Sequence, residues 1–134
     1  MADLTITPAS VAPVRIDEQR SGPTAVAMEA GVVVYVDSNG KYALANGNAA
    51  PQAVAAGITL EKATTAGETV TVMRKGLLDV GNALSALAFQ APVYLSNTSG
   101  GILGDGAGSV SLVVGTVVPV WGATTADKLL RVNL

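Results

Sequence analysis

The chain has 134 residues, with 8 Lys and Arg against 10 Asp and Glu, and it contains no His and no Cys. This length suits one domain that buries its core without disulfides or metal. The missing His and Cys exclude the usual zinc sites, cysteine nucleophiles and Ser-His-Asp triads. The formal charge of −2 and the scattered cations argue against nucleic-acid binding. We also expect no membrane span, because no apolar run reaches about 18 residues. We expect no secretion signal, because the N-terminus lacks a basic region followed by an apolar stretch.

Charged residues make up only 13% of the chain, and there is one Phe and one Trp. The core must therefore be built mainly from Val, Ala, Leu and Ile. So few charges leave an unusually apolar surface, and such surfaces usually contact other proteins. The composition therefore favours a protein that works in an assembly.

Residues 1–24 contain Pro8, Pro13 and Pro23. Prolines this close disfavour helix and favour an extended backbone. We predict an extended N-terminal arm that orders on contact with another protein and that the body can fold without. Its larger apolar side chains are Ile6, Val11, Val14 and Ile16.

From residue 25 the composition changes to that of a β domain, which we place at residues 25–134. Residues 25–28 and 32–36 are rich in β-branched or small apolar side chains. Asn39-Gly40 then predicts a hairpin turn into residues 41–44, because both residues accept positive φ. The next expected strand is 54–60, where Gly57 marks a bulge or a close approach of two backbones.

The second half of the chain continues this pattern. Residues 68–74 alternate between apolar and polar side chains and predict a strand, and residues 76–80 predict a separate short strand. Asn82 is a suitable N-cap for the one short helix that we expect, through residue 87. The remaining predicted strands are 92–95, 110–120 and 128–134.

Two parts of the chain resemble each other at a spacing of about 59 residues. Residues 31–73 and 90–132 share the order of their apolar runs and of the motif Ala-Thr-Thr-Ala, and Gly115 lies where the first copy has Gly57. We interpret this as two similar β-units around a shared core. The alternative is two unrelated sets of strands with similar composition.

No stretch predicts catalysis, a cofactor or a metal site. The glycines of residues 104–108 lack the spacing of a dinucleotide loop and predict a flexible hairpin loop. Asp37 opens a sequence like half of a calcium loop, but no Glu stands at the required distance. Two of the carboxylates of Asp37, Asp79 and Asp105 could act as acid and base in a hydrolase of the glycosidase type. We expect Asp79, however, to be a capping or turn residue. We therefore expect a protein that is not an enzyme.

The basic residues and the tryptophan are candidates for contacts between proteins. Arg74-Lys75 is the only adjacent basic pair, and Arg15 and Arg20 lie in the arm. Solvated surface charges are one interpretation, and ion pairs to acidic patches of a neighbouring subunit are the other. Trp121 is expected to plug the core or to anchor an interface.

With its residues laid out in this way, the chain resembles the capsid decoration proteins of tailed bacteriophages, also called cement or head-stabilising proteins, and in particular their capsid-cement-like group. The resemblance covers roughly residues 25–134 and consists of patterns of glycine and small apolar residues. It lies in Gly31-Val32-Val33-Val34-Tyr35-Val36-Asp37, Val54-Ala55-Ala56-Gly57-Ile58, Ala66-Gly67-Glu68-Thr69-Val70-Thr71-Val72, Gly76-Leu77-Leu78-Asp79, Ala91-Pro92-Val93-Tyr94-Leu95-Ser96 and Val114-Gly115-Thr116-Val117-Val118.

The resemblance implies an all-β fold, a small barrel or sandwich of the β-tulip kind, on the outer face of an icosahedral capsid. It implies a homotrimer, with a dimer as the alternative, that is made in the bacterial cytoplasm and links major capsid protein subunits in the virion. The alternative function is a head-fibre or carbohydrate-binding module, which would require clustered aromatic side chains. The expected contact residues are Ile6, Pro8, Val11, Pro13, Val14, Arg15, Ile16, Arg20, Arg74, Lys75 and Trp121.

Overall fold

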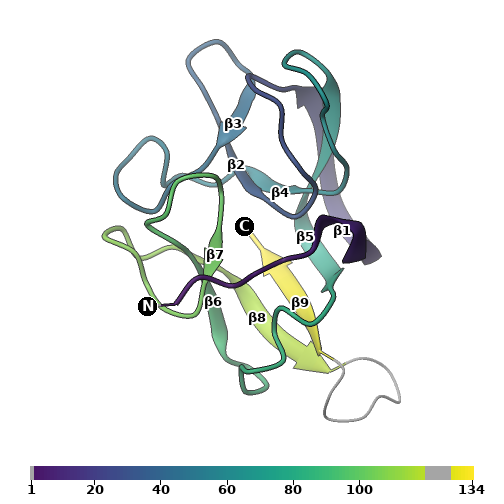
Figure 1. Cartoon of the computed structure of the whole chain (residues 1–134), viewed down its shortest axis with the longest axis vertical. Helices are drawn as coiled ribbons and strands as arrows, with labels where there is room; N and C mark the ends of the chain where they lie inside the picture. The colour runs from purple at the N-terminus through teal and green to yellow at the C-terminus, as the bar shows by residue number, and fades with distance from the viewer. Residues whose placement is uncertain (1, 120–127) are drawn as a thin grey trace.

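A computed structural model describes residues 2–119 and 128–134. Over these residues the fold is all-β, as predicted, and the only helix is the single turn η1 (Pro8–Ser10). The strands are β1 (Val11–Pro23), β2 (Val33–Val36), β3 (Tyr42–Leu44), β4 (Gly57–Thr59), β5 (Thr69–Val80), β6 (Pro92–Leu95), β7 (Leu103–Gly104), β8 (Val113–Pro119) and β9 (Lys128–Asn133). Figure 1 shows them as one curled sheet.

The strand order is the same in the two predicted β-units. The sheet runs β3-β2-β4-β5-β9-β8-β6-β7, so that β3-β2-β4-β5 is followed by the same arrangement in reverse. Val34 lies opposite Gly57 in the first unit, and Val93 lies opposite Gly115 in the second. The residues matched in sequence therefore hold matching positions in the fold.

The two ends of the sheet meet through backbone hydrogen bonds that join Val33 of β2 and the loop after β3 to the loop between β6 and β7. The Gly101 N–H donates to the Ala45 carbonyl over 2.8 Å, and the Val33 N–H donates to the Gly101 carbonyl over 2.9 Å. The Gly47 N–H donates to the Ser96 carbonyl over 2.8 Å. These bonds join the end of the first unit to the second, which bends the sheet into a half-barrel around the core.

The core consists of aliphatic side chains, as the composition predicts. Met73, Leu78, Leu95 and Leu130 are fully buried in the main cluster, together with several valines. The accessible surface of 6512 Å² is close to the roughly 6500 Å² typical of a compact monomer of 13.4 kDa. The fold therefore buries an ordinary share of its own surface without a partner.

Residues 11–23 are extended, as predicted, but they do not form a separate arm. They make up β1, which pairs with β5 in antiparallel register from Val11 opposite Val80 to Pro23 opposite Thr69. On the other edge of β5, first β4 and then β9 pair along its length. The expectation that this whole segment orders only on contact with another protein is wrong, because backbone hydrogen bonds to β5 already hold it.

Two further predictions need correction. The separate strands expected at 68–74 and 76–80 are one strand, β5, in which Gly76 has φ +147° and lies close to β1. The helix expected at 82–87 is absent. The segment forms turns instead, in which the Ser85 N–H donates a hydrogen bond to the Asn82 carbonyl. The Lys128 ammonium donates to the Ser85 and Leu87 carbonyls, which fixes these turns and occupies acceptors at their end.

Candidate interaction surface

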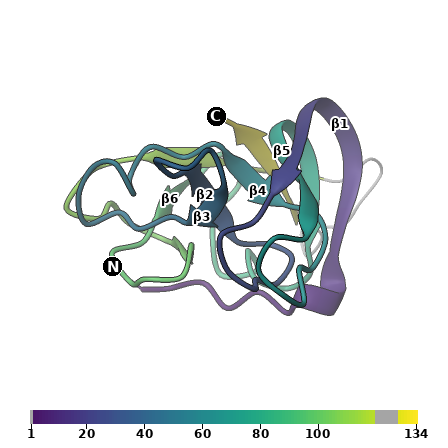
Figure 2. The same ribbon diagram turned by 90° about the horizontal axis from the view of Figure 1, so that it is seen from above.

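The most exposed regular element of the described structure is β1. Ten of its thirteen residues are exposed, and its outer edge pairs with no other strand among the described residues. Figure 2 shows β1 and β5 running side by side at one end of the molecule. A long edge strand on a rigid neighbour is the part of a sheet most open to a partner.

The structure brings two groups of predicted contact residues together on this ribbon. Glu18 of β1 lies opposite Lys75 of β5, and its carboxylate is 3.9 Å from the guanidinium groups of both Arg20 and Arg74. We use the name basic end of β1 for Arg20 of β1 together with Arg74 and Lys75 in the adjoining part of β5. These exposed or half-exposed ion pairs contribute about 0 to 1 kcal/mol each, so the basic side chains can exchange partners at low cost.

The other end of β1 carries apolar side chains. Val14 is 52% exposed and Ile16 is 41% exposed, and Arg15 beside them pairs with Asp17 over 3.1 Å. Val14 lies within a register shift between β1 and β5, and such bulges redirect side chains. Pro13 lies opposite Leu78, and its missing N–H interrupts the strand edge.

Three of the remaining predicted contact residues do not belong to the exposed part of β1. Ile6 and Val11 are half-buried and pack against the main core cluster, and Pro8 begins η1. Trp121 lies outside the described residues, so its predicted role stays a prediction. The predicted surface is therefore gathered mainly on β1 and β5.

Residues 2–8 form a strap across the molecule that sequence reasoning did not place. The Leu4 N–H donates to the Leu103 carbonyl over 2.8 Å, and the Asp3 carboxylate accepts hydrogen bonds from the Ser96 and Thr98 hydroxyls. These hydrogen bonds, first that from Ser96, lower the pKa of the Asp3 carboxyl below its usual value. The alternation of Leu4 and Ile6 with polar residues is the signal that could have predicted it.

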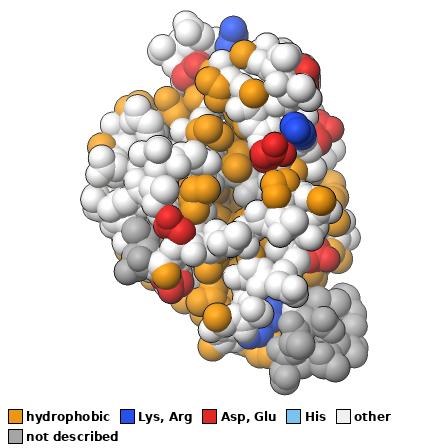
Figure 3. Space-filling model, viewed as in Figure 1, with side chains coloured by type: hydrophobic (Ala, Val, Ile, Leu, Met, Phe, Trp, Pro, Cys, Tyr) orange, Lys and Arg blue, Asp and Glu red, His pale blue; other side chains and the backbone are white. Residues whose placement is uncertain are grey.

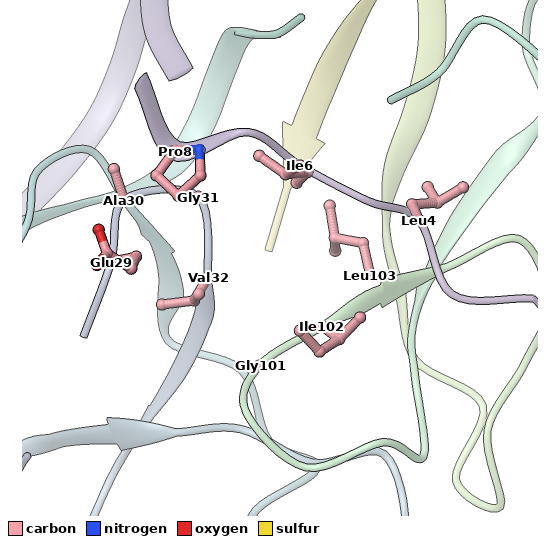
Figure 4. Close-up of a pocket in the computed structure, with 10 residues that line it drawn as sticks. All are labelled: Leu4, Ile6, Pro8, Glu29, Ala30, Gly31, Val32, Gly101, Ile102 and Leu103. Carbon is pink, nitrogen blue, oxygen red and sulfur yellow. The ribbon is translucent and has the colours of Figure 1, made fainter. Parts of the chain in front are cut away.

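Beside the strap lies an open hollow of about 200 Å³, lined mainly by apolar side chains. Leu4 and Ile6 of the strap form one wall, and Val32 and Ile102 form others. Figure 4 shows how these side chains come from three separate segments. Figure 3 shows hydrophobic side chains gathered near the middle of this face, with acidic side chains and a basic side chain around them. We call this feature the apolar hollow.

The three aspartates considered for catalysis each bind backbone at a different place. Asp37 accepts from the N–H groups of Asn39 and Lys41 in the predicted hairpin turn. Asp79 accepts from the Gly81 N–H, as expected of a turn residue, and Asp105 accepts from the Ala2 N–H. Among the residues that the structure describes, no group of three acidic, His or Cys side chains could hold a metal ion.

The tyrosines do not offer three equivalent aromatic faces for a sugar. Tyr42 is buried in the second core cluster, where its ring packs against Gly22. Tyr35 and Tyr94 are half-buried at matching positions of β2 and β6.

No helix in the described part of the chain is long and apolar enough to cross a membrane.

Comparison of the chain with models of known families, with curated proteins and with solved structures found no match.

Proposed function

We propose that this chain is a structural, non-enzymatic capsid decoration protein. It binds the outer surface of an icosahedral phage capsid and stabilises the contacts between major capsid protein subunits. The observation that supports this most is the β1 surface, a thirteen-residue exposed strand that carries most of the contact residues expected from the sequence. The resemblance of residues 25–134 to capsid-cement-like proteins supplies the partner.

A strand that is already ordered suits a binding role. Ordering a free peptide costs about 1 to 2 kcal/mol of backbone entropy per residue. Because β1 is held on β5 before any partner arrives, that cost falls within the folding of the monomer. Modest contacts can then suffice, since several copies on one oligomer bind through a high effective concentration.

Within the β1 surface, the basic end is assigned to the capsid. Arg20 and Lys75 are exposed, and Arg74 holds Glu18 only at 3.9 Å. Arginine grips carboxylates in bidentate geometry, which suits an acidic patch on a neighbouring subunit. Their charges would steer the protein to such a patch and fix its orientation.

The test is co-sedimentation of the purified protein with expanded capsid shells of the phage that encodes it. The Arg20→Glu/Lys75→Glu variant should bind at least about tenfold more weakly, because like charges then face the acidic patch. Lys41→Glu is the control, since Lys41 is also exposed but lies in the β2–β3 turn, outside β1 and β5. Equal binding of the double variant and the control would refute the assignment of this surface. Failure of the natural chain to bind any expanded shell would refute the proposed function itself.

A further inference from the structure

The apolar hollow is large enough to accept an aliphatic side chain. Its volume of about 200 Å³ lies below the roughly 300 Å³ at which pockets for drug-sized ligands begin. It nevertheless far exceeds the roughly 30 Å³ that one water occupies in the liquid. Leu4, Ile6, Val32 and Ile102 give it apolar walls (Figure 4), so a branched aliphatic group would gain by entering it.

The β1 edge offers side chains rather than backbone to a partner. Three register shifts and Pro13 break its hydrogen-bonding edge, and such devices oppose edge-to-edge pairing. The order of charges along β1 has the same effect. A centred antiparallel pair of two β1 strands would place Asp17 of one copy opposite Asp17 of the other, and like charges directly opposite are unfavourable.

Val14 and the hollow match in shape and charge. Val14 projects at a bulge, is 52% exposed and is followed by Arg15. Glu29 lines the hollow, and among the described residues its carboxylate pairs with Lys62 at 3.4 Å, in an exposed ion pair. An aliphatic side chain with a cation beside it is therefore complementary to an apolar depression with a carboxylate at its edge.

We propose that Val14 of one copy enters the apolar hollow of a second copy, with Arg15 beside the second copy's Glu29. The donor and the acceptor are different parts of the chain, so the contact is head-to-tail and repeats until a ring closes or a filament grows. One side chain and its neighbours bury little area, so a single contact is weak and a closed ring is needed for a stable oligomer. This contact between copies uses the Pro13–Ile16 end of β1 and does not rest on the capsid proposal.

The experiment exploits the absence of cysteine from the chain. Two single variants, Val14→Cys and Ala30→Cys, are mixed and mildly oxidised; Ala30 lines the hollow. Because each variant has one thiol, every disulfide joins two copies. We expect the Val14→Cys/Ala30→Cys product to form at least about tenfold faster than the product of Val54→Cys with Ala30→Cys, since oriented thiols react faster than randomly colliding ones. Val54 is a fair control because it is 66% exposed and lies in a loop.

A second measurement follows association by sedimentation over a range of concentrations. Val14→Ser, and Ala30→Leu, which enlarges a side chain lining the hollow, should both lower the association constant about tenfold or more, while Val54→Ser leaves it unchanged. The proposal is overturned if the natural chain stays monomeric at about 1 mM, or if Val14→Cys links mainly to itself. It is also overturned if Val14→Cys with Ala30→Cys yields no more disulfide than Val54→Cys with Ala30→Cys. Capsid binding by a monomeric Ala30→Leu variant, with reduced avidity, would show that capsid binding and the contact between copies are separable.

Discussion

Replacing Gly115 by alanine tests the packing between β8 and β9. An added Cβ at Gly115 would lie 2.0 Å from the Arg131 carbonyl oxygen, whereas at Gly57 the nearest atom, the Met73 oxygen, would be 2.9 Å away. Restoring an ordinary contact of 3.4 Å requires a shift of about 1.4 Å at Gly115 but only about 0.5 Å at Gly57. The two equivalent glycines should therefore differ in how much they tolerate a side chain.

The magnitude follows from the hydrogen bonds that the larger shift would break. A movement of about 1.4 Å separates β8 from β9 around Gly115 and Thr116, which lie opposite Val132 and Arg131. Leaving one or two buried backbone groups unpaired costs about 1 to 3 kcal/mol each. We expect Gly115→Ala to lower the free energy of unfolding by about 3 to 5 kcal/mol, and Gly57→Ala by about 1 to 2 kcal/mol, the lower part of the range for overpacking.

Urea denaturation of the two variants and the natural chain measures this difference. At about 3 to 5 °C per kcal/mol for a domain of this size, Gly115→Ala should also melt roughly 10 to 20 °C lower. Equal destabilisation of the two variants, within about 0.5 kcal/mol, would refute the reasoning, because it would mean that the local backbone relaxes freely at both glycines.

Three further predictions concern the core, the strap and β1. Leu130→Ala should cost about 2 to 5 kcal/mol in urea denaturation because Leu130 is fully buried, whereas Val54→Ala should change stability by less than about 0.5 kcal/mol. The lowered pKa of Asp3 means that its ionised form stabilises the strap, so this stabilisation is present above about pH 4 and is lost as the pH falls through the folded-state pKa. The protection factor of the Leu4 amide, which is its hydrogen exchange corrected for the intrinsic rate at each pH, should therefore fall in acid. Asp3→Asn should lower this protection factor at neutral pH and remove its fall in acid; an unchanged protection factor in the variant would argue against a stabilising role of Asp3. Removing residues 2–10 should leave a cooperative unfolding transition in urea. Removing residues 2–23 should markedly lower the urea midpoint of that transition, because this deletion removes β1 from the edge of β5.

Local sequence signals predicted the parts of the fold that depend on one or two residues. The turn at residues 37–40 forms as expected, with Gly40 at φ +75° and the Asp37 carboxylate binding the turn N–H groups. Gly57 and Gly115 both lie where another backbone passes close by. Each of these outcomes follows from steric or hydrogen-bonding needs that a single residue type meets.

The candidate surface could be predicted only in part. The arm residues Val14, Arg15 and Arg20 and the pair Arg74-Lys75 were recognised separately, but their proximity was not. Nothing in the sequence of an exposed strand names its partner, because backbone hydrogen bonds are the same for almost every residue type. The apolar hollow escaped prediction for a related reason, since its walls come from three segments distant in the sequence.

Composition and local periodicity were enough to predict the all-β class, the aliphatic core and the absence of His and Cys chemistry, and they also revealed the repeated order of apolar runs. Local patterns did not predict that residues 11–23 pair with β5 instead of forming an arm. They also did not predict that residues 82–87 form turns that accept a hydrogen bond from Lys128. The reason is that a short helix or an exposed strand has little stability of its own. Contacts with distant parts of the chain therefore determine the conformation of such segments.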